Sequence, residues 1–313
     1  MWLRCAVGLY LLTTVVVAEA APPADVAATN RVLKQVRRVL AEQGFTGINI
    51  GGGAALSLAM TARHGSGLAW NDVDIGGYPR RGKVDAARMK QVAAALTRGG
   101  KARVLAPGPF EFTYEREGGL RSRGFGMKLE DSTGAHYDIA LLHGPAELKT
   151  AGFNSTEGLF IPLRKGDTVE RIVARLSRGS AGHVVSRGDL IEPHGQAVAV
   201  LNNKIALTNK WQLDASPELV ALRLLRGLEK LHELGNAKQK VDARSALRWI
   251  KKSLPRAMGS VREAKDPSYP FVVQDQAQKL LASGNRRLLT EAKKLGLDLR
   301  ALAKGQLDRP AAR

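Results

Sequence analysis

Three consecutive glycines at the end of an apolar segment constrain this chain most. Residues 48–50 are suited to a short buried strand, and Gly51, Gly52 and Gly53 follow them directly. Residues 54–60 then have the composition of a helix. Glycine permits a tight turn and a close backbone approach, and the amides at a helix N-terminus attract anions. The stretch therefore predicts a strand, a glycine turn and a helix that together hold a phosphate.

Two aspartates follow this unit on a second short segment. Asp72 and Asp74 are separated by one residue, so on a strand their side chains point to the same face. Two hard carboxylate ligands beside a phosphate site are the outline of a magnesium site, because Mg²⁺ is commonly held by one or two carboxylates and substrate phosphates. A glycine turn alone or an Asp-x-Asp pair alone is commonplace. In this order and at this spacing they predict a Mg²⁺-dependent phosphate site.

The combination resembles the nucleotidyltransferase superfamily that includes DNA polymerase beta, in which Gly-Gly or Gly-Ser, a helix and Asp-x-Asp follow one another. Gly52, Gly53, Asp72 and Asp74 are the matching residues, and the continuation is most similar to the abortive-infection (AbiEii-type) branch. Ala54 stands where that branch has a hydroxyl residue. The resemblance implies transfer of a nucleoside monophosphate from a triphosphate, with Mg²⁺ as the cofactor.

Asp138 is a third candidate, because it is a polar residue in the otherwise apolar segment 137–142. A buried carboxylate without a partner is costly, so Asp138 is expected either to be paired at a hairpin edge or to serve a site. In the resembled superfamily a third carboxylate comes from a strand beside the Asp-x-Asp strand. The resemblance therefore implies that Asp138 completes the metal site and helps to deprotonate the acceptor.

The rest of the chain divides into two parts. Residues 21–190 contain a helix at 25–43, the glycine turn, a helix near 84–98, strands at 110–114, 124–130 and 136–142, and a capping box at 167–170. Residues 191–313 read as helices at 198–210, 217–234, 242–252 and 274–295. The expected fold class is α+β, with a nucleotidyltransferase-like mixed sheet flanked by helices and followed by an all-helical domain.

Lys204 lies in the helical part, in a segment similar to the lysine-bearing helix of the AbiEii-type enzymes. The resemblance implies that Lys204 faces the cleft and binds nucleotide phosphate. On a chain with this many basic residues, an ordinary solvated lysine is the alternative.

Residues 1–20 have a basic start, an apolar run and an Ala-x-Ala end, the layout of a cleavable secretory signal. Export to the periplasm or the medium follows if this signal is used, and a cytoplasmic location if it is not. The apolar run is short for a membrane span, so no stable span is expected after removal of the signal. The single cysteine, Cys5, lies within the signal.

The formal net charge of +19 favours phosphate-bearing partners such as nucleotides and nucleic acids. Histidine and cysteine spacings typical of zinc sites are absent from the sequence, as is a Walker loop. The main interpretation is a nucleotidyltransferase that uses a nucleoside triphosphate and an acceptor such as RNA. A toxin acting on tRNA and paired with an antitoxin is a subclass that only the resemblance suggests. The rival interpretation is an exported, non-catalytic basic binding protein that keeps this fold.

Overall fold

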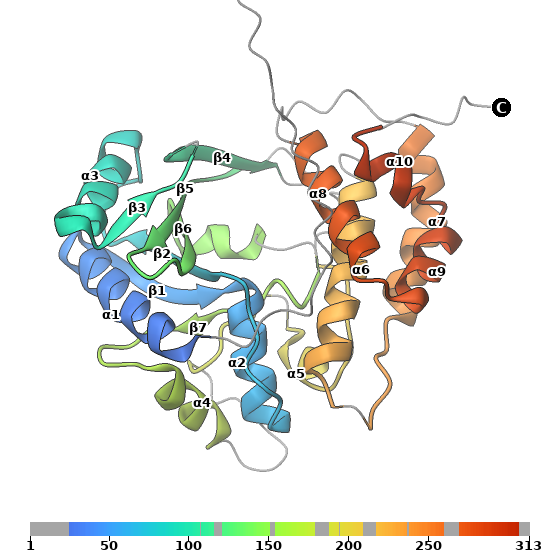
Figure 1. The fold of residues 1–313 in the computed structure, drawn as a ribbon, viewed down its shortest axis with the longest axis horizontal. Helices are drawn as coiled ribbons and strands as arrows, with labels where there is room; N and C mark the ends of the chain where they lie inside the picture. Colours follow the sequence, from blue (N-terminus) through green and yellow to red (C-terminus); the bar gives the residue numbers. More distant parts are fainter. Residues whose placement is uncertain are drawn as a thin grey trace, which may run out of the picture.

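The computed structural model describes residues 25–106, 108–115, 121–150, 154–178, 188–193, 195–208, 217–236, 238–259 and 269–306. The expected signal at 1–20 lies outside these ranges. The described part is an α+β structure in which a mixed sheet precedes a group of helices (Figure 1). No helix in these ranges is both long and apolar enough to cross a membrane.

The strands are β1 Phe45–Gly51, β2 Val73–Pro79, β3 Ala102–Val104, β4 Phe110–Glu115, β5 Arg121–Asp131, β6 His136–Leu142 and β7 Ile161–Pro162. They form one sheet of seven strands in the order β3-β5-β6-β2-β1-β7, with β4 also paired to β5. β2 and β6 are parallel, and the other pairs are antiparallel. The strands expected at 124–130 and 136–142 lie within β5 and β6, which pair as an antiparallel hairpin.

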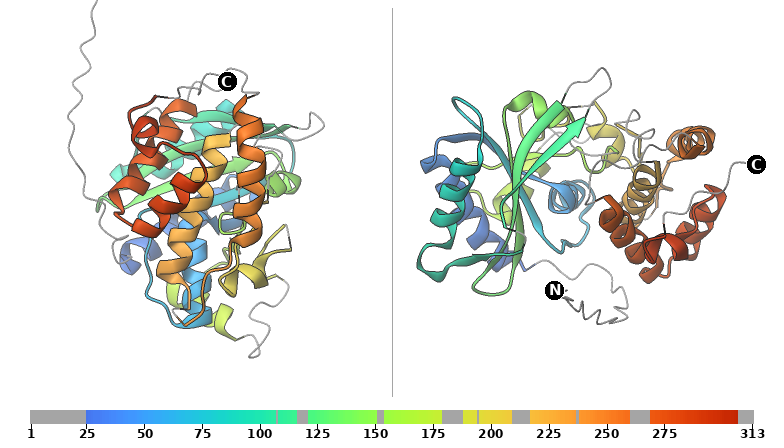
Figure 2. Two further views of the ribbon diagram at one scale, coloured as in Figure 1. Left: turned by 90° about the vertical axis from the view of Figure 1, so that its right-hand side faces the viewer. Right: turned by 90° about the horizontal axis from the view of Figure 1, so that it is seen from above.

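The helices are α1 Val26–Glu42, α2 Gly52–His64, α3 Ala86–Thr97, α4 Val169–Ser177, α5 Ala197–Leu201, α6 Pro217–Leu234, α7 Arg244–Gly259, α8 Tyr269–Ala282, α9 Arg286–Lys294 and α10 Leu299–Ala303, with 3-10 turns at Arg98–Gly100 and Pro145–Thr150. α1 begins as the sequence predicts, because the Asp25 side chain accepts a hydrogen bond from the Ala28 amide. α6 to α10 gather on one side of the sheet (Figure 2).

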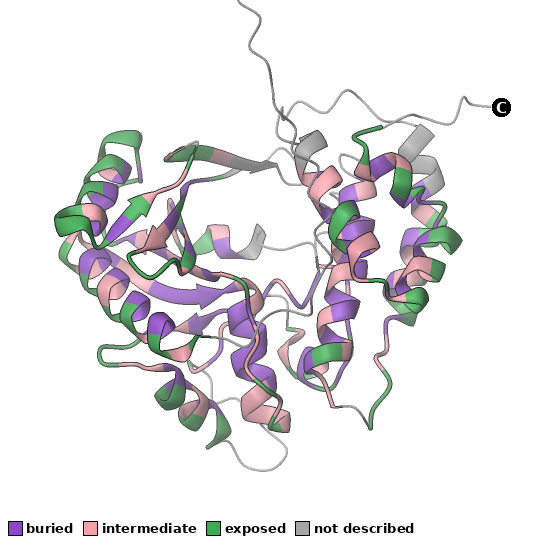
Figure 3. Cartoon of the chain, in the orientation of Figure 1, coloured by how far each residue is buried: buried purple, intermediate pink, exposed green. Residues whose placement is uncertain are grey.

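One hydrophobic core joins the two parts of the chain. Buried side chains continue from α1 and the strands through α2 into α6, α8 and α9 (Figure 3). Leu33, Ile50 and Leu56 on the sheet side and Leu222 and Leu225 on α6 are fully buried members of this cluster. Because the helical part shares its core with the sheet part, α6 is held firmly against the end of β1 and α2.

Three predictions of local structure were wrong, and two short strands were not predicted. The helix expected at 198–210 ends at Leu201, after which Lys204 forms an isolated bridge with Asp242. The helix expected at 274–295 is two helices, since Gly284 has a positive φ and Asn285 caps α9. β3 and β7 were not predicted, because strands of two or three residues carry too little periodicity. The capping box expected at 167–170 was also wrong in its first residue, because Thr168 and not Asp167 caps α4.

Gly227 tests how closely α6 packs. A Cβ added there would lie 2.7 Å from Ile205 Cδ1 and 2.8 Å from Thr156 Oγ1. Gly227→Ala is therefore expected to lower the free energy of unfolding by up to about 2 kcal/mol, because overpacking costs about 1–3 kcal/mol and the helix-propensity gain is about 1 kcal/mol. Urea denaturation measures this. Gly67→Ala is the control, since nothing lies within 4 Å of its added Cβ. Equal stability of the two variants would contradict the close packing.

Candidate active site

The sheet aligns the glycine turn with two of the predicted carboxylates. Gly51 at the end of β1 pairs with Asp74 on β2, and Asp74 pairs with Asp138 on β6. Lys128 on β5 continues the row opposite Asp138. Because neighbouring strands lie about 4.8 Å apart, four residues from four chain segments lie in one line across the sheet. The structure thus brings together Gly51, Asp74 and Asp138 as the sequence suggested.

Asp72 lies just before β2 and shares a face with Asp74. Val73 and Ile75 are buried, at 4% and 0% exposure, whereas Asp72 and Asp74 are partly exposed. This alternation is that of a strand with one face in the core. It turns both carboxylates away from the core and toward the end of the sheet at which β1 stops.

Gly52 allows the turn and the carboxylate to occupy neighbouring space. Its φ of +58° is in the left-handed region, and a Cβ at this position would lie 1.8 Å from Asp74 Oδ2. Any side chain would collide with the carboxylate, and an L-residue would also have a strained backbone. The glycine predicted for phosphate binding is therefore also required by the position of Asp74.

The N-terminus of α2 has no side-chain cap. Gly51 is the N-cap residue and makes no side-chain hydrogen bond to the first turn. The first-turn amides of a helix lack intrahelical partners and carry its positive dipole end, so this end of α2 suits an anion. The Ala54 side chain is 1% exposed and packs in the core. A phosphate here would be bound by backbone amides rather than by the residue at position 54.

The gathered carboxylates repel one another. Burial first, and then the charges of Asp72 and Asp138, raise the pKa of Asp74 from 3.8 to about 7, against the opposing effects of Lys230 and Arg223. Burial also raises the pKa of Asp138, although Lys128 acts in the opposite direction. Lys128 Nζ lies 3.4 Å from Asp138 Oδ2. A cation is thus favoured at this place by the electrostatics of the protein.

A basic face of α6 approaches the glycine turn, and sequence reasoning did not identify it. Lys230 Nζ lies 3.0 Å from the position of a Cβ built on Gly53. Burial lowers the pKa of Lys230, while Glu157 and the two aspartates Asp74 and Asp72 raise it. Arg223 on the same helix pairs with Glu157, its Nη1 3.7 Å from Oε1. Lys230 is therefore placed to bind a phosphate on the first turn of α2.

The spacing of basic residues in the sequence indicates this face of α6. Arg223, Arg226 and Lys230 are spaced by three and four residues, so they share one side of a helix that is otherwise largely apolar. All three are partly exposed on a helix with many buried positions. Polar residues in such a stripe indicate either an ion-pair network or a site.

Lys204 lies elsewhere. It is exposed, its backbone bridges Asp242, and its charge lowers the pKa of the Asp242 carboxyl after the larger effects of Arg244. The adjoining residues 201 and 202 contact His64 and Arg63, at the C-terminal end of α2. A helix of 13 residues is about 20 Å long, so this end of α2 is far from the glycine turn. The structure brings Lys230, and not Lys204, to Gly53.

The donor set fits a hard divalent cation. Asp72, Asp74 and Asp138 offer carboxylate oxygens, which Mg²⁺ prefers, and a cation would offset the repulsion that raises the pKa of Asp74. Within the described ranges, no three histidine, cysteine, aspartate or glutamate side chains already have the geometry of a metal site. The three aspartates therefore share a strand end rather than a preformed coordination shell.

Comparison of the chain with protein-family models and with curated proteins finds no match.

Gly52 and Gly65 give a matched test, because both are left-handed glycines at the two ends of α2. Gly65→Ala meets nothing within 4 Å and should cost only the backbone strain of about 1–2 kcal/mol. Gly52→Ala adds the collision with Asp74 and should lower the free energy of unfolding by about 2 kcal/mol more. Gly52→Ala/Asp74→Ala should recover that extra loss. Equal effects of the two single substitutions in chemical denaturation would contradict the contact.

Proposed function

We propose that this chain is a Mg²⁺-dependent nucleotidyltransferase with a nucleotidyltransferase-like sheet. The observation that carries the proposal is the register of the sheet, which pairs Asp74 with Gly51 on one side and with Asp138 on the other. Phosphate-binding amides and carboxylates thereby meet at one strand end. A purely structural sheet gains nothing from gathering acidic groups that repel one another.

The side chains have distinct roles in this proposal. Asp72, Asp74 and Asp138 would hold Mg²⁺, which supplies positive charge to the phosphates that react. The amides at Gly52 and Gly53 bind the triphosphate, and Lys230 neutralises part of its charge from α6. Lys204 has no role in this proposal, because it lies far from the glycine turn.

The transfer breaks a phosphoanhydride bond and forms a phosphodiester bond. An acceptor hydroxyl attacks the α-phosphorus, the bond to the bridging oxygen breaks, and pyrophosphate leaves with the nucleotide's β- and γ-phosphates. Asp138 accepts the hydroxyl proton, a role that its raised pKa favours. Positioning and neutralisation of charge supply most of the catalysis, as in other phosphoryl transfers. RNA is the proposed acceptor, in keeping with the net charge of +19.

The test uses each labelled nucleoside triphosphate with Mg²⁺ and total RNA. The parent chain is expected to transfer label, and Asp74→Asn and Asp138→Asn are each expected to lower the rate by at least about 10²-fold, as loss of a charge-stabilising group does. Circular dichroism and thermal melting show whether each variant is folded. Transfer at the parent rate by a folded Asp72→Asn/Asp74→Asn variant would contradict the assigned metal ligands.

The two lysines provide a paired control. Lys230→Met is expected to weaken triphosphate binding about 10-fold or more, since a charge-assisted hydrogen bond contributes about 1.5–3 kcal/mol. Lys204→Met should leave binding unchanged, because this side chain is exposed and distant from the turn. Tightening of triphosphate binding by Mg²⁺ separates the enzyme from a non-catalytic basic binding protein, which would bind equally well without the metal.

A further inference from the structure

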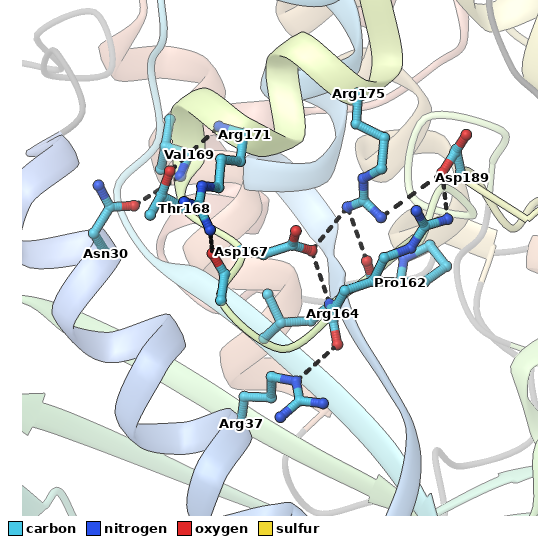
Figure 4. A network of polar contacts seen from close by, with 12 residues as sticks. Asn30, Arg37, Pro162, Arg164, Asp167, Thr168, Val169, Arg171, Arg175 and Asp189 are labelled. Atoms are coloured by element: carbon cyan, nitrogen blue, oxygen red, sulfur yellow. Dashed lines mark hydrogen bonds and ion pairs between the residues drawn. The ribbon is translucent and has the colours of Figure 1, made fainter.

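A basic cavity, separate from the candidate active site, lies between the end of β7 and the outer side of α4. Its volume is about 380 Å³, and Arg164, Lys165, Asp167, Arg171, Ala174, Arg175 and Arg178 line it. Five of the seven lining side chains are cationic and one is acidic. Figure 4 shows how the arginines converge around the turn that connects β7 to α4.

Arg175 has two side-chain nitrogen atoms that form no hydrogen bond in the described part of the chain. Its side chain is 12% exposed, and Nη2 donates to Pro162 O at 3.1 Å and to Asp167 Oδ2 at 2.9 Å. Nε and Nη1 are buried and form no hydrogen bond within the described part of the chain. Nη1 approaches Asp189 Oδ1 only to 3.8 Å, beyond hydrogen-bond length. Both atoms are shielded from solvent, so the positive charge of Arg175, rather than these two donors, would attract an anion to the pocket.

The surrounding charges are only partly balanced. Arg164 pairs with Asp189 at 2.5 Å, and Arg171 donates to the Gly166 carbonyl oxygen. Lys165 and Arg178 are exposed, and neither forms an ion pair among the described residues. The pocket therefore keeps a positive excess that favours an anion.

The turn before α4 positions the charged side chains that line the pocket. The predicted capping box placed Asp167 at the start of α4, but Thr168 is the cap, and its side chain accepts from the Arg171 amide. Asp167 instead accepts from the Arg164 amide at 2.8 Å and from Arg175. The acidic residue thus fixes the turn and orients one edge of the Arg175 guanidinium. Nε and Nη1 form no hydrogen bond among the described residues, and Nη1 faces Asp189 at 3.8 Å.

We infer that this pocket binds a phosphate group of the RNA acceptor, an inference that rests on the proposed function. The exposed cations Lys165, Arg171 and Arg178 line the cavity and can bind phosphate oxygens. β7 connects the two sites, because Phe160 just before it lies against Gly51 and Pro162 accepts from Arg175. Two strand residues span roughly 7 Å, so one RNA chain can reach both places. Phosphate contacts of this kind position a nucleic acid without reading its sequence.

The test measures the affinity of the full chain for a labelled single-stranded RNA oligonucleotide at several salt concentrations, without triphosphate or Mg²⁺. Lys165→Ala/Arg178→Ala removes two exposed charges and leaves the Arg175 network intact. Each lost phosphate contact lowers the slope of log K against log salt by about 0.7, so the variant should lose about 1.4 in slope and roughly 10-fold in affinity at low salt.

Lys83→Ala/Lys90→Ala is the matched control, since it removes two exposed charges near and on α3. It should bind RNA as the parent does, within about twofold. Inorganic phosphate should also raise the melting temperature of the parent more than that of Lys165→Ala/Arg178→Ala, which loses two cations that line the pocket. Equal losses of RNA affinity in the two double variants would overturn the inference. The inference would also be overturned if Lys165→Ala/Arg178→Ala bound RNA as the parent does but lost binding to anionic lipid vesicles.

The outcome is independent of catalysis. RNA affinity lost only in the pocket variant supports the pocket even if no triphosphate is ever consumed. Label transfer by the parent together with unchanged RNA binding by the pocket variant would refute the pocket and leave the proposed function standing.

Discussion

Parallel pairing of β2 with β6 sets Asp74 opposite Asp138, although the two residues lie far apart in the chain. The antiparallel partner of β2 on its other side is β1, which stops at Gly51 beside the same carboxylate. The carboxylates and the glycine turn of the candidate active site take their places from this register. A shift by one residue would turn Asp72 and Asp74 into the core and carry Val73 outward, at the cost of burying two unpaired charges.

Holding these acids together requires compensation from other elements. Lys128 pairs with Asp138 across β5 and β6, and Lys230 brings a cation from α6 toward Asp74. The shared core between the sheet part and α6 fixes that cation in place. Gly52 accommodates the carboxylate sterically, since no other residue fits beside Asp74 Oδ2. The site is therefore built jointly by a glycine turn, two strands and a helix from the second part of the chain.

The sequence predicted those features that depend on neighbouring residues. The helix expected at 25–43, the glycine turn and the strands at 124–130 and 136–142 carry local signals, and each was found close to where it was expected. Lys204 was chosen from a resemblance, and the position beside Gly53 belongs to Lys230, because long-range packing of α6 is not encoded in any short segment. The Thr168 cap was missed for a related reason. Asp167 is held by Arg164 and Arg175, which leaves the next residue to cap the helix.

The central claim is that Asp74 is a buried carboxylate that lies among other carboxylates, and the pH dependence of stability tests it most directly. The native pKa of Asp74, about 7, lies above its ordinary value of 3.8. Between about pH 4 and pH 7 the native state therefore keeps a proton that the unfolded state releases, so stability falls as pH rises through this window and levels off above it. In the presence of a chelator, the free energy of unfolding of the parent should fall by up to about 4 kcal/mol relative to that of Asp74→Asn between these pH values. Added Mg²⁺ at pH 8 should recover part of this loss. Parallel stability curves for parent and Asp74→Asn, with no response to Mg²⁺, would contradict the account.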